Sequence, residues 1–302
     1  MTPPASPPPP APDFGRLGLG GVTFGREIEE EAAFALMDHA VHRGIRLFDT
    51  AAAYGAGASE RIVGRWFAAR RPAPGAVLVA TKLLPPYTPA QLEAGLAACR
   101  QRLAPAPIAV LYLHRWDESA AAPETLATLH RFVAQGEVGL LGASNFTAAQ
   151  LERTLALQSA AGLAPFRVLQ NNHNFAVRDV DPALRRLCAA AGLALVTYSP
   201  LGAGFLTGKH RAGVVPGSRF DVIPGHQRTY FTETARTRLA CLEAVARRTG
   251  HAPAHLALAW ALRQPGPATV LVGGRRPAHL DQALTALDGD AAAALAELAA
   301  CP

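Results

Sequence analysis

The sequence is poor in the residues that mark several common classes of protein. Its only cysteines are Cys99, Cys188, Cys241 and Cys301, which lie far apart and form no C-x-x-C pair. This spacing argues against a metal site built from cysteines. We therefore expect four reduced thiols, as is usual in a cytoplasmic protein, and no bound metal.

The chain also lacks a long apolar run and a basic block. Its longest stretch without a charged residue, 187–208, is interrupted by Pro200 and four glycines, so it predicts a buried strand and a loop rather than a membrane span. The net charge of +6 comes from dispersed basic residues, without the Lys/Arg clusters that bind nucleic acid. We expect no membrane or nucleic-acid partner, and a modest positive charge suits a small ligand that carries phosphate.

The N-terminus has little but proline, alanine and serine. It lacks the basic and apolar regions of a secretion signal, so residues 1–13 are expected to form a disordered, proline-rich tail. The rest of the 302-residue chain is long enough for one large domain, and half of all residues are apolar. We expect residues 14–302 to form that single domain.

Short apolar segments alternate with helical patterns along the whole chain. The strands are expected within residues 17–21, 45–49, 77–82, 108–114, 136–145, 166–170, 193–198 and 268–272. This alternation predicts an α/β fold with parallel strands. An open doubly wound sheet is the competing architecture, but Thr23 stands where the third glycine of G-x-G-x-x-G belongs. We therefore expect a parallel (β/α)8 TIM barrel, with a long lid loop over residues 199–231 after the seventh strand.

Three successive expected strands end in side chains that can do chemistry. Asp49 and then Tyr54 follow the second strand, Lys82 ends the third, and His114 ends the fourth. In a parallel β/α barrel all these ends open on one face, which carries the active site. Each residue alone has an ordinary structural explanation, such as a turn cap for Asp49 or a solvated side chain for Lys82. Their joint placement favours a catalytic group.

Short motifs in these and later segments, in order, resemble those of the aldo-keto reductase family. The motifs occupy residues 48–51 with Tyr54, 80–82, 113–114, 142–146, Gln170 and 198–202. Each motif alone is weak, but together they extend over nearly the whole chain. The resemblance implies a (β/α)8 barrel that uses NADPH to reduce an aldehyde or ketone to the alcohol.

The same resemblance gives each catalytic candidate a role. Tyr54 would be the general acid, although a free tyrosine has a pKa of about 10. The Lys82 ammonium would lower that pKa, and Asp49 would hold Lys82 in place. His114 would donate a hydrogen bond to the substrate oxygen, as donors do in an oxyanion site.

The resemblance also implies an NADPH site along the mouth of the barrel. Ser144, Asn145 and Gln170 match residues that hold the carboxamide, and Tyr198 matches the aromatic residue that stacks on the nicotinamide. The other residues expected to bind the cofactor are Gly21, Val22, Thr23, Ser199, Pro200, Leu201, Gly202, Lys209, Gly273, Arg275, Arg276 and Gln282.

The last of these motifs departs from the family pattern. Gln282 and Ala283 stand where the family usually has the Glu and Asn that contact adenine. Arg275 and Arg276 keep the basic character that would favour the extra phosphate of NADPH over NADH. We expect the phosphate contacts to carry an unusually large share of cofactor binding.

The substrate pocket is expected at Phe24 and Trp116, with a small carbonyl compound as the partner. Two alternatives remain open. One is a non-catalytic, redox-sensing regulatory subunit that binds NADPH on the same barrel, like the potassium-channel β subunits that resemble this family. The other is a different barrel enzyme, such as an aldolase with Lys82 as a Schiff base, because a fold does not fix a function.

Overall fold

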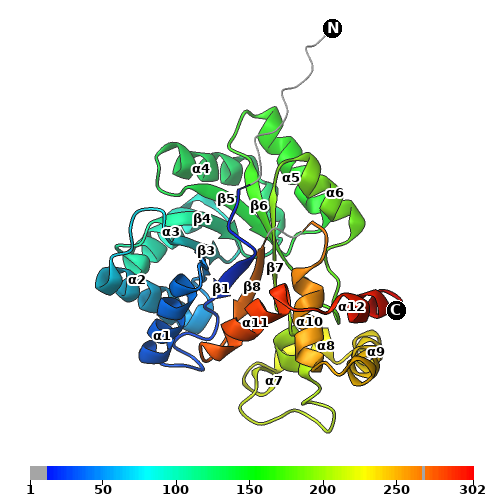
Figure 1. Ribbon diagram of the computed structural model, residues 1–302. Helices are drawn as coiled ribbons and strands as arrows, with labels where there is room; N and C mark the ends of the chain where they lie inside the picture. The colour runs from blue at the N-terminus through cyan, green and yellow to red at the C-terminus, as the bar shows by residue number, and fades with distance from the viewer. Residues whose placement is uncertain (1–11, 267–268) are drawn as a thin grey trace.

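The structure, a computed structural model, describes residues 12–266 and 269–302. Eight parallel strands close into a barrel in sequence order, with β8 pairing back onto β1. Helices surround the barrel (Figure 1). The expected (β/α)8 architecture is confirmed. The strands are β1 (Leu17–Gly20), β2 (Leu47–Asp49), β3 (Leu78–Leu83), β4 (Ile108–Leu113), β5 (Leu140–Ser144), β6 (Phe166–Asn172), β7 (Ala194–Tyr198) and β8 (Thr269–Gly273).

The barrel interior is a small apolar core distinct from the larger layer between strands and helices. Phe14, which is 3% exposed and precedes β1, packs into this core at the amino-terminal end of the barrel. The other buried members are Leu47, Ala80, Val110, Tyr112, Val168, Ala194, Val196 and Leu271. Residue 14 therefore already belongs to the core of the barrel. Of the tail expected at residues 1–13, residues 1–11 lie outside the described part of the chain.

The helices bury their apolar stripes against the outer faces of the strands. Local signals start several of them: Asp181 accepts a hydrogen bond from Leu184 N at 2.7 Å before Pro182, and Thr147 forms a capping box with Gln150. The long helices are α1 (Glu30–His42), α2 (Ala58–Arg70), α3 (Pro89–Leu103), α4 (Pro123–Ala134), α5 (Ala148–Ala160), α6 (Pro182–Ala190), α9 (Glu233–Thr249), α10 (Pro253–Leu262), α11 (Ala278–Asp288) and α12 (Ala292–Ala299).

The segment after β7 is folded rather than a plain loop. It contains η3 (Gly202–Thr207), α7 (Arg219–Val222), η4 (Pro224–His226) and α8 (Gln227–Tyr230), and Figure 1 shows α7 and α8 to one side of the barrel. Its short helices share an aromatic cluster of Phe205, His210, Phe220, Tyr230 and Phe231, with neighbouring ring centroids 4.9–6.3 Å apart. These aromatic contacts explain why a glycine-rich and proline-rich stretch holds a defined shape.

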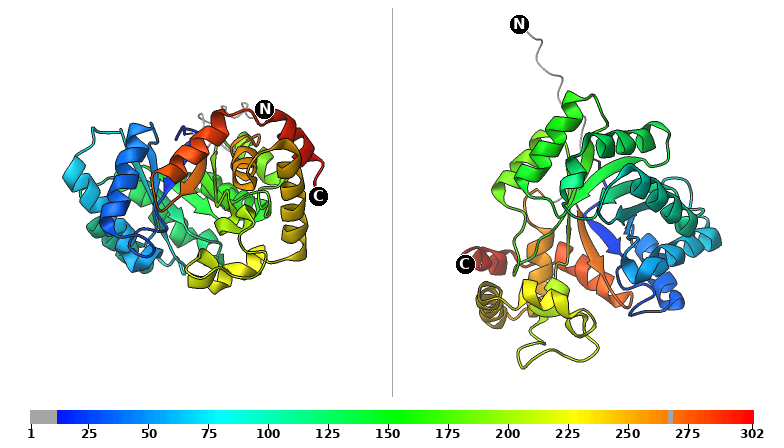
Figure 2. Two further views of the ribbon diagram at one scale, coloured as in Figure 1. Left: turned by 60° about the horizontal axis from the view of Figure 1, so that its bottom comes forward. Right: turned by 180° about the vertical axis from the view of Figure 1, so that it is seen from behind.

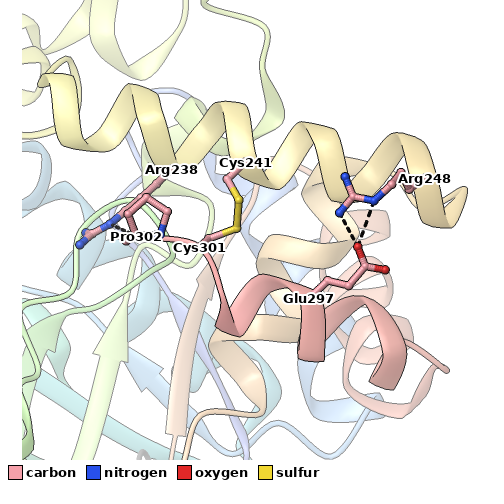
Figure 3. Close-up of a disulfide and its surroundings, with 6 residues drawn as sticks. All are labelled: Arg238, Cys241, Arg248, Glu297, Cys301 and Pro302. Carbon is pink, nitrogen blue, oxygen red and sulfur yellow. Dashed lines mark hydrogen bonds and ion pairs between the residues drawn. A yellow bond between two sulfur atoms is a disulfide. The ribbon is translucent and has the colours of Figure 1, made fainter.

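The expectation of four reduced thiols is wrong for two of them. Cys241 on α9 and Cys301 after α12 form a disulfide (Figure 3). Cys99 and Cys188 are free and buried. The two cysteines are 60 residues apart in the sequence, but α12 packs against α9 and brings them together (Figure 2). Sequence analysis linked reduced thiols to a cytoplasmic location. Because two of the cysteines form a disulfide, they no longer support that location.

The contact between α9 and the C-terminal segment is also polar. Arg248 pairs with Glu297 of α12, and Arg238 Nε donates to the Pro302 carbonyl at 2.9 Å (Figure 3). None of the helices in residues 12–266 and 269–302 has both the length and the hydropathy of a membrane span.

Candidate active site

Asp49 and Lys82 form a buried ion pair at the carboxyl ends of β2 and β3. Lys82 Nζ lies 2.5 Å from Asp49 Oδ2, and their side chains are 1% and 3% exposed. Lys82 also donates to the Thr50 carbonyl at 2.9 Å, and Gln170 Nε2 donates to Asp49 Oδ1 at 2.8 Å. A buried ion pair is costly unless further hydrogen bonds satisfy both ions. These contacts therefore fix the lysine in one position.

Tyr54 approaches this pair from the turn after β2. Its hydroxyl is 3.4 Å from Lys82 Nζ, and the ammonium is 4.9 Å from its ring centroid. Tyr54 N donates to the Ala51 carbonyl at 3.0 Å, and η1 (Tyr54–Gly57) continues with positive φ at Gly55, where φ is 55°. Residues 51–53 are all alanine, which allows this tight turn. The turn aims the phenol of Tyr54 back over the end of β2.

The pKa values of the two groups set their protonation. Burial raises the pKa of Tyr54 above its usual 10.0, while the Lys82 ammonium acts in the opposite direction. The predicted sign of the Lys82 effect is right, but the net shift is upward because burial outweighs it. Burial lowers the pKa of Lys82, but Asp49 and Tyr54 more than offset it, so that pKa is raised. At neutral pH Lys82 is charged and Tyr54 holds its proton, as a proton donor must.

His114 lies beside Tyr54 and is neutral. Their ring centroids are 5.9 Å apart in an edge-to-face arrangement. Burial, with the Lys82 and Arg115 charges, lowers the pKa of His114 to about 3. Among the described residues, its Nδ1 has no hydrogen-bond partner. A neutral imidazole keeps one N–H to donate, so His114 can hydrogen-bond an oxygen atom. The four side chains predicted to be catalytic therefore lie together at one end of the barrel.

Two expected carboxamide contacts, Ser144 and Asn145, lie next to His114 together with Tyr198, the expected stacking residue. Tyr198 donates its hydroxyl to Asn145 Oδ1 at 2.7 Å, and Asn145 Nδ2 reaches the His114 carbonyl at 2.9 Å and Ser144 Oγ at 3.1 Å. Asn145 has a φ of 59°, a conformation that Asn accepts more readily than most residues. These hydrogen bonds join the ends of β5 and β7 beside the candidate catalytic residues.

The turn after Tyr198 bends repeatedly into the left-handed region. Ser199, Gly202, Ala203 and Gly204 have φ values of 57°, 57°, 56° and 94°. Successive left-handed residues turn backbone N–H groups toward one side and form concave anion sites. Lys209 lies against this turn, since a Cβ added at Gly204 would be 3.4 Å from its Nζ. Pro200 and Leu201 belong to the same turn.

Basic groups converge where β8 leads into α11. Arg275 N donates to His279 Nδ1 at 3.1 Å, and Arg275 Nη2 donates to the Gly217 carbonyl at 2.9 Å. Burial and the charges of Arg276, Arg275 and Lys209 all lower the pKa of His279. His279, which the sequence does not single out, lies four residues after Arg275 in the first turn of α11. Gln282 is exposed on α11 at the next turn.

The turn after β1 braces the site through its backbone. Gly21 N donates to the Asp49 carbonyl at 2.8 Å, and Thr23 Oγ1 donates to the Gly274 carbonyl at 3.0 Å. Ser59, in the first turn of α2, donates to the Gly21 carbonyl at 2.8 Å. The Val22 carbonyl accepts from Arg26 Nη2 at 2.8 Å.

The two expected pocket residues differ in exposure. Phe24 is 1% exposed and belongs to the core, so its ring is not presented to a ligand here. Trp116 is partly exposed and packs edge-to-face on Phe146, with ring centroids 5.1 Å apart. Of the two side chains, only Trp116 is exposed enough to contact a ligand.

Several known proteins are similar in sequence to most of this chain. Norsolorinic acid reductase B of Dothistroma septosporum is 30% identical over 297 residues, covering 90% of this chain and 74% of that protein. Probable aldo-keto reductase 1 of Glycine max is 29% identical over 290 residues, covering 91% and 80%. An uncharacterized oxidoreductase of Bacillus subtilis is 28% identical over 293 residues, covering 90% and 87%.

The fold has a close match among solved structures. A glycerol dehydrogenase from Gluconobacter oxydans superposes with a TM-score of 0.75 at 24% identity, covering 95% of this chain and 92% of that one. The sequence profile of the Aldo/keto reductase family matches residues 16–298. The chain therefore belongs to the aldo/keto reductase family, a family of oxidoreductases that bind a nicotinamide cofactor.

Proposed function

We propose that the protein is an NADPH-dependent reductase that converts an aldehyde or ketone to the alcohol, with Tyr54 as the general acid. The observation that carries this proposal is the position of the Tyr54 hydroxyl, 3.4 Å from a lysine that Asp49 holds in a buried ion pair. A protonated phenol beside a fixed ammonium can release its proton to a neighbouring oxygen and remain stabilised as the phenolate.

The residues present fit a nicotinamide dinucleotide. Ser144, Asn145 and Gln170 would hold the carboxamide, and Tyr198 would stack on the ring. The left-handed turn at 199–204 suits the pyrophosphate, and the cluster of Lys209, Arg275, Arg276 and His279 suits a further phosphate. When bound, NADPH would supply the hydride, which no side chain of the protein can provide.

The protein's own residues would handle the substrate oxygen. His114, kept neutral by burial, would donate a hydrogen bond and orient the carbonyl. Tyr54 would give its proton to the same oxygen, and Lys82 would stabilise the phenolate that remains. Trp116 would form an apolar wall of the pocket.

We also propose that the segment after β7 acts as a lid over the cofactor. Two contacts hold this segment to its neighbours. Arg219 Nη1 lies 3.4 Å from Glu27 Oε1, before α1, and Arg275, after β8, donates to the Gly217 carbonyl. Hydrogen exchange over residues 199–231 should slow when NADPH is added. Equal protection in both states would show a static connection.

The Schiff-base alternative has a physical objection. A Schiff base requires an uncharged amine as the nucleophile, whereas Asp49 and Tyr54 raise the pKa of Lys82 and keep it protonated. A regulatory, non-catalytic subunit would bind NADPH and turn over no carbonyl compound.

The test is a panel of carbonyl compounds monitored through NADPH absorbance. The panel includes aliphatic, sugar and aromatic carbonyls, because a relative is named for norsolorinic acid and a structural neighbour for glycerol. Turnover of at least one carbonyl, with weaker use of NADH, supports the proposal. Tight NADPH binding with no turnover across the panel would favour the regulatory alternative.

A further inference from the structure

Tyr230 is a buried tyrosine at the end of α8, outside the catalytic group. It is 3% exposed, and its ring lies beside Phe205 and Phe220, with centroids 6.2 and 5.8 Å away. An apolar cluster of this kind needs no hydroxyl. The phenol therefore requires an explanation from its polar contacts.

The phenol joins the folded segment after β7 to the end of β6. Tyr230 donates its hydroxyl to Asn172 Oδ1 at 3.2 Å and accepts from Asn174 Nδ2 at 3.3 Å. Asn174 Nδ2 also donates to Asn172 Oδ1 at 3.1 Å, which closes a buried triangle. Asn172 is the register partner of Tyr198 in the barrel. The phenol is thus anchored beside the strand that ends in Tyr198.

The same side chain touches the turn that follows Tyr198. Burial raises the pKa of Tyr230, and its contacts with Asn172, Asn174 and Ser199 act in the opposite direction. Ser199 and Gly202 both have a φ of 57°. A Cβ added at Gly202 would lie only 3.0 Å from Tyr230 Cε1, so the ring packs directly on the backbone of the turn.

We propose that Tyr230 is a positioning residue for the nicotinamide cofactor, because its ring and hydroxyl fix the turn at residues 198–204. Non-glycine residues in left-handed conformations, here Ser199 and Ala203, revert to extended or helical conformations unless their surroundings hold them. Tyr230 supplies that restraint through the Gly202 packing contact and the hydrogen bond to Asn172. This inference rests on the proposed function.

The test compares Tyr230→Phe with Tyr87→Phe. Tyr87 is also fully buried and donates its hydroxyl at 2.8 Å, but to the Arg115 carbonyl and not to the turn after β7. Both variants lose one hydroxyl and keep the ring. Loss of one hydrogen bond corresponds to about fivefold in an equilibrium constant. We expect the NADPH dissociation constant to rise about fivefold in Tyr230→Phe, on the same basis, and to stay unchanged in Tyr87→Phe.

A second readout separates positioning from general destabilisation. Without cofactor, amides of residues 199–206 should exchange faster in Tyr230→Phe than in the parent, while amides in α2 and α3 keep their rates. Saturating NADPH should restore most of the turnover number. Gly202→Ala provides an independent route, because its methyl group must displace the ring or the turn, and it should weaken NADPH binding by at least as much.

The outcomes are distinct. An unchanged NADPH dissociation constant in Tyr230→Phe overturns the inference, as does an equal loss in Tyr87→Phe accompanied by a lower melting temperature in both. A parent protein with no affinity for NADPH or NADH instead overturns the proposed function. If Tyr230→Phe does not fold, unchanged binding in Gly202→Ala contradicts the inference.

Discussion

The side-chain amide of Gln170 donates a hydrogen bond across 2.8 Å to Oδ1 of Asp49. These residues lie on β6 and β2, four strands apart in the closed barrel, so the bond crosses the barrel interior. Gln170 was expected only as a cofactor contact. Its bond to Asp49 connects that contact to the Asp49–Lys82 pair, and through it to Tyr54.

Gln170→Met should therefore reduce turnover as well as cofactor binding. A hydrogen bond to a charged group contributes about 1.5–3 kcal/mol, so we expect the turnover number to fall roughly tenfold or more at saturating NADPH. Ser144→Ala is the matched control, because it removes an expected carboxamide contact without touching Asp49. An unchanged turnover number in Gln170→Met would show that Asp49 does not depend on this amide.

Arg275→Ala should weaken NADPH binding more than NADH binding. The basic cluster around His279 would attract the phosphate that only NADPH carries. We expect the NADPH dissociation constant to rise about tenfold or more and that for NADH to change little. Because Arg275 also binds the Gly217 carbonyl, equal weakening of both cofactors would mean that it acts by holding the lid segment.

Acid should destabilise the fold through His114 and His173, whose charged forms the folded state disfavours. Desolvation lowers the pKa of both side chains to about 3, whereas the ordinary pKa of a histidine is 6.5. Between these values the unfolded chain binds more protons, so stability is present above about pH 6.5 and is lost as pH falls toward 3. Each histidine contributes a slope of up to about 1.4 kcal/mol per pH unit. Urea unfolding between pH 7.5 and 4.5 measures this slope, and His114→Gln should reduce it. A flat profile would contradict the neutral state of these side chains.

Reduction of the disulfide should lower stability without changing catalysis. Cross-linking a 60-residue loop stabilises the folded state by about 4 kcal/mol in the chain-entropy model. We expect a reducing agent to lower the melting temperature of the parent, and the double variant Cys241→Ser with Cys301→Ser to be insensitive to it. A parent that melts identically with and without reductant would show that the bond is not formed in solution.

The sequence predicts the fold well because its signals are local. Apolar segments of strand length, Asp181 before Pro182 and the polar strand ends at Asp49, Lys82 and His114 each carry a signal within a few residues. The barrel then follows from the alternation. The positions of the proposed catalytic side chains follow in turn, because parallel strands bring their carboxyl ends to one face.

What the sequence does not predict depends on contacts between distant segments. The Cys241–Cys301 bond requires α12 to return along α9, and the Gln170–Asp49 bond requires closure of the barrel. The net rise in the Tyr54 pKa depends on burial, which no local pattern specifies. The pocket prediction for Phe24 is wrong for a similar reason. Its position after a strand suggests a pocket wall, but its side chain is buried in the core.

The most direct test of the account is the turnover of Tyr54→Phe on the best substrate of the carbonyl panel, at saturating NADPH. The substitution keeps the ring beside Lys82 and His114 and removes only the hydroxyl that would give its proton to the substrate oxygen. General acid–base groups contribute roughly 10²–10⁴-fold. The account predicts a loss of that size with the NADPH dissociation constant nearly unchanged. Turnover within a factor of about two of the parent would contradict it, since a group worth 10²-fold or more cannot then be Tyr54.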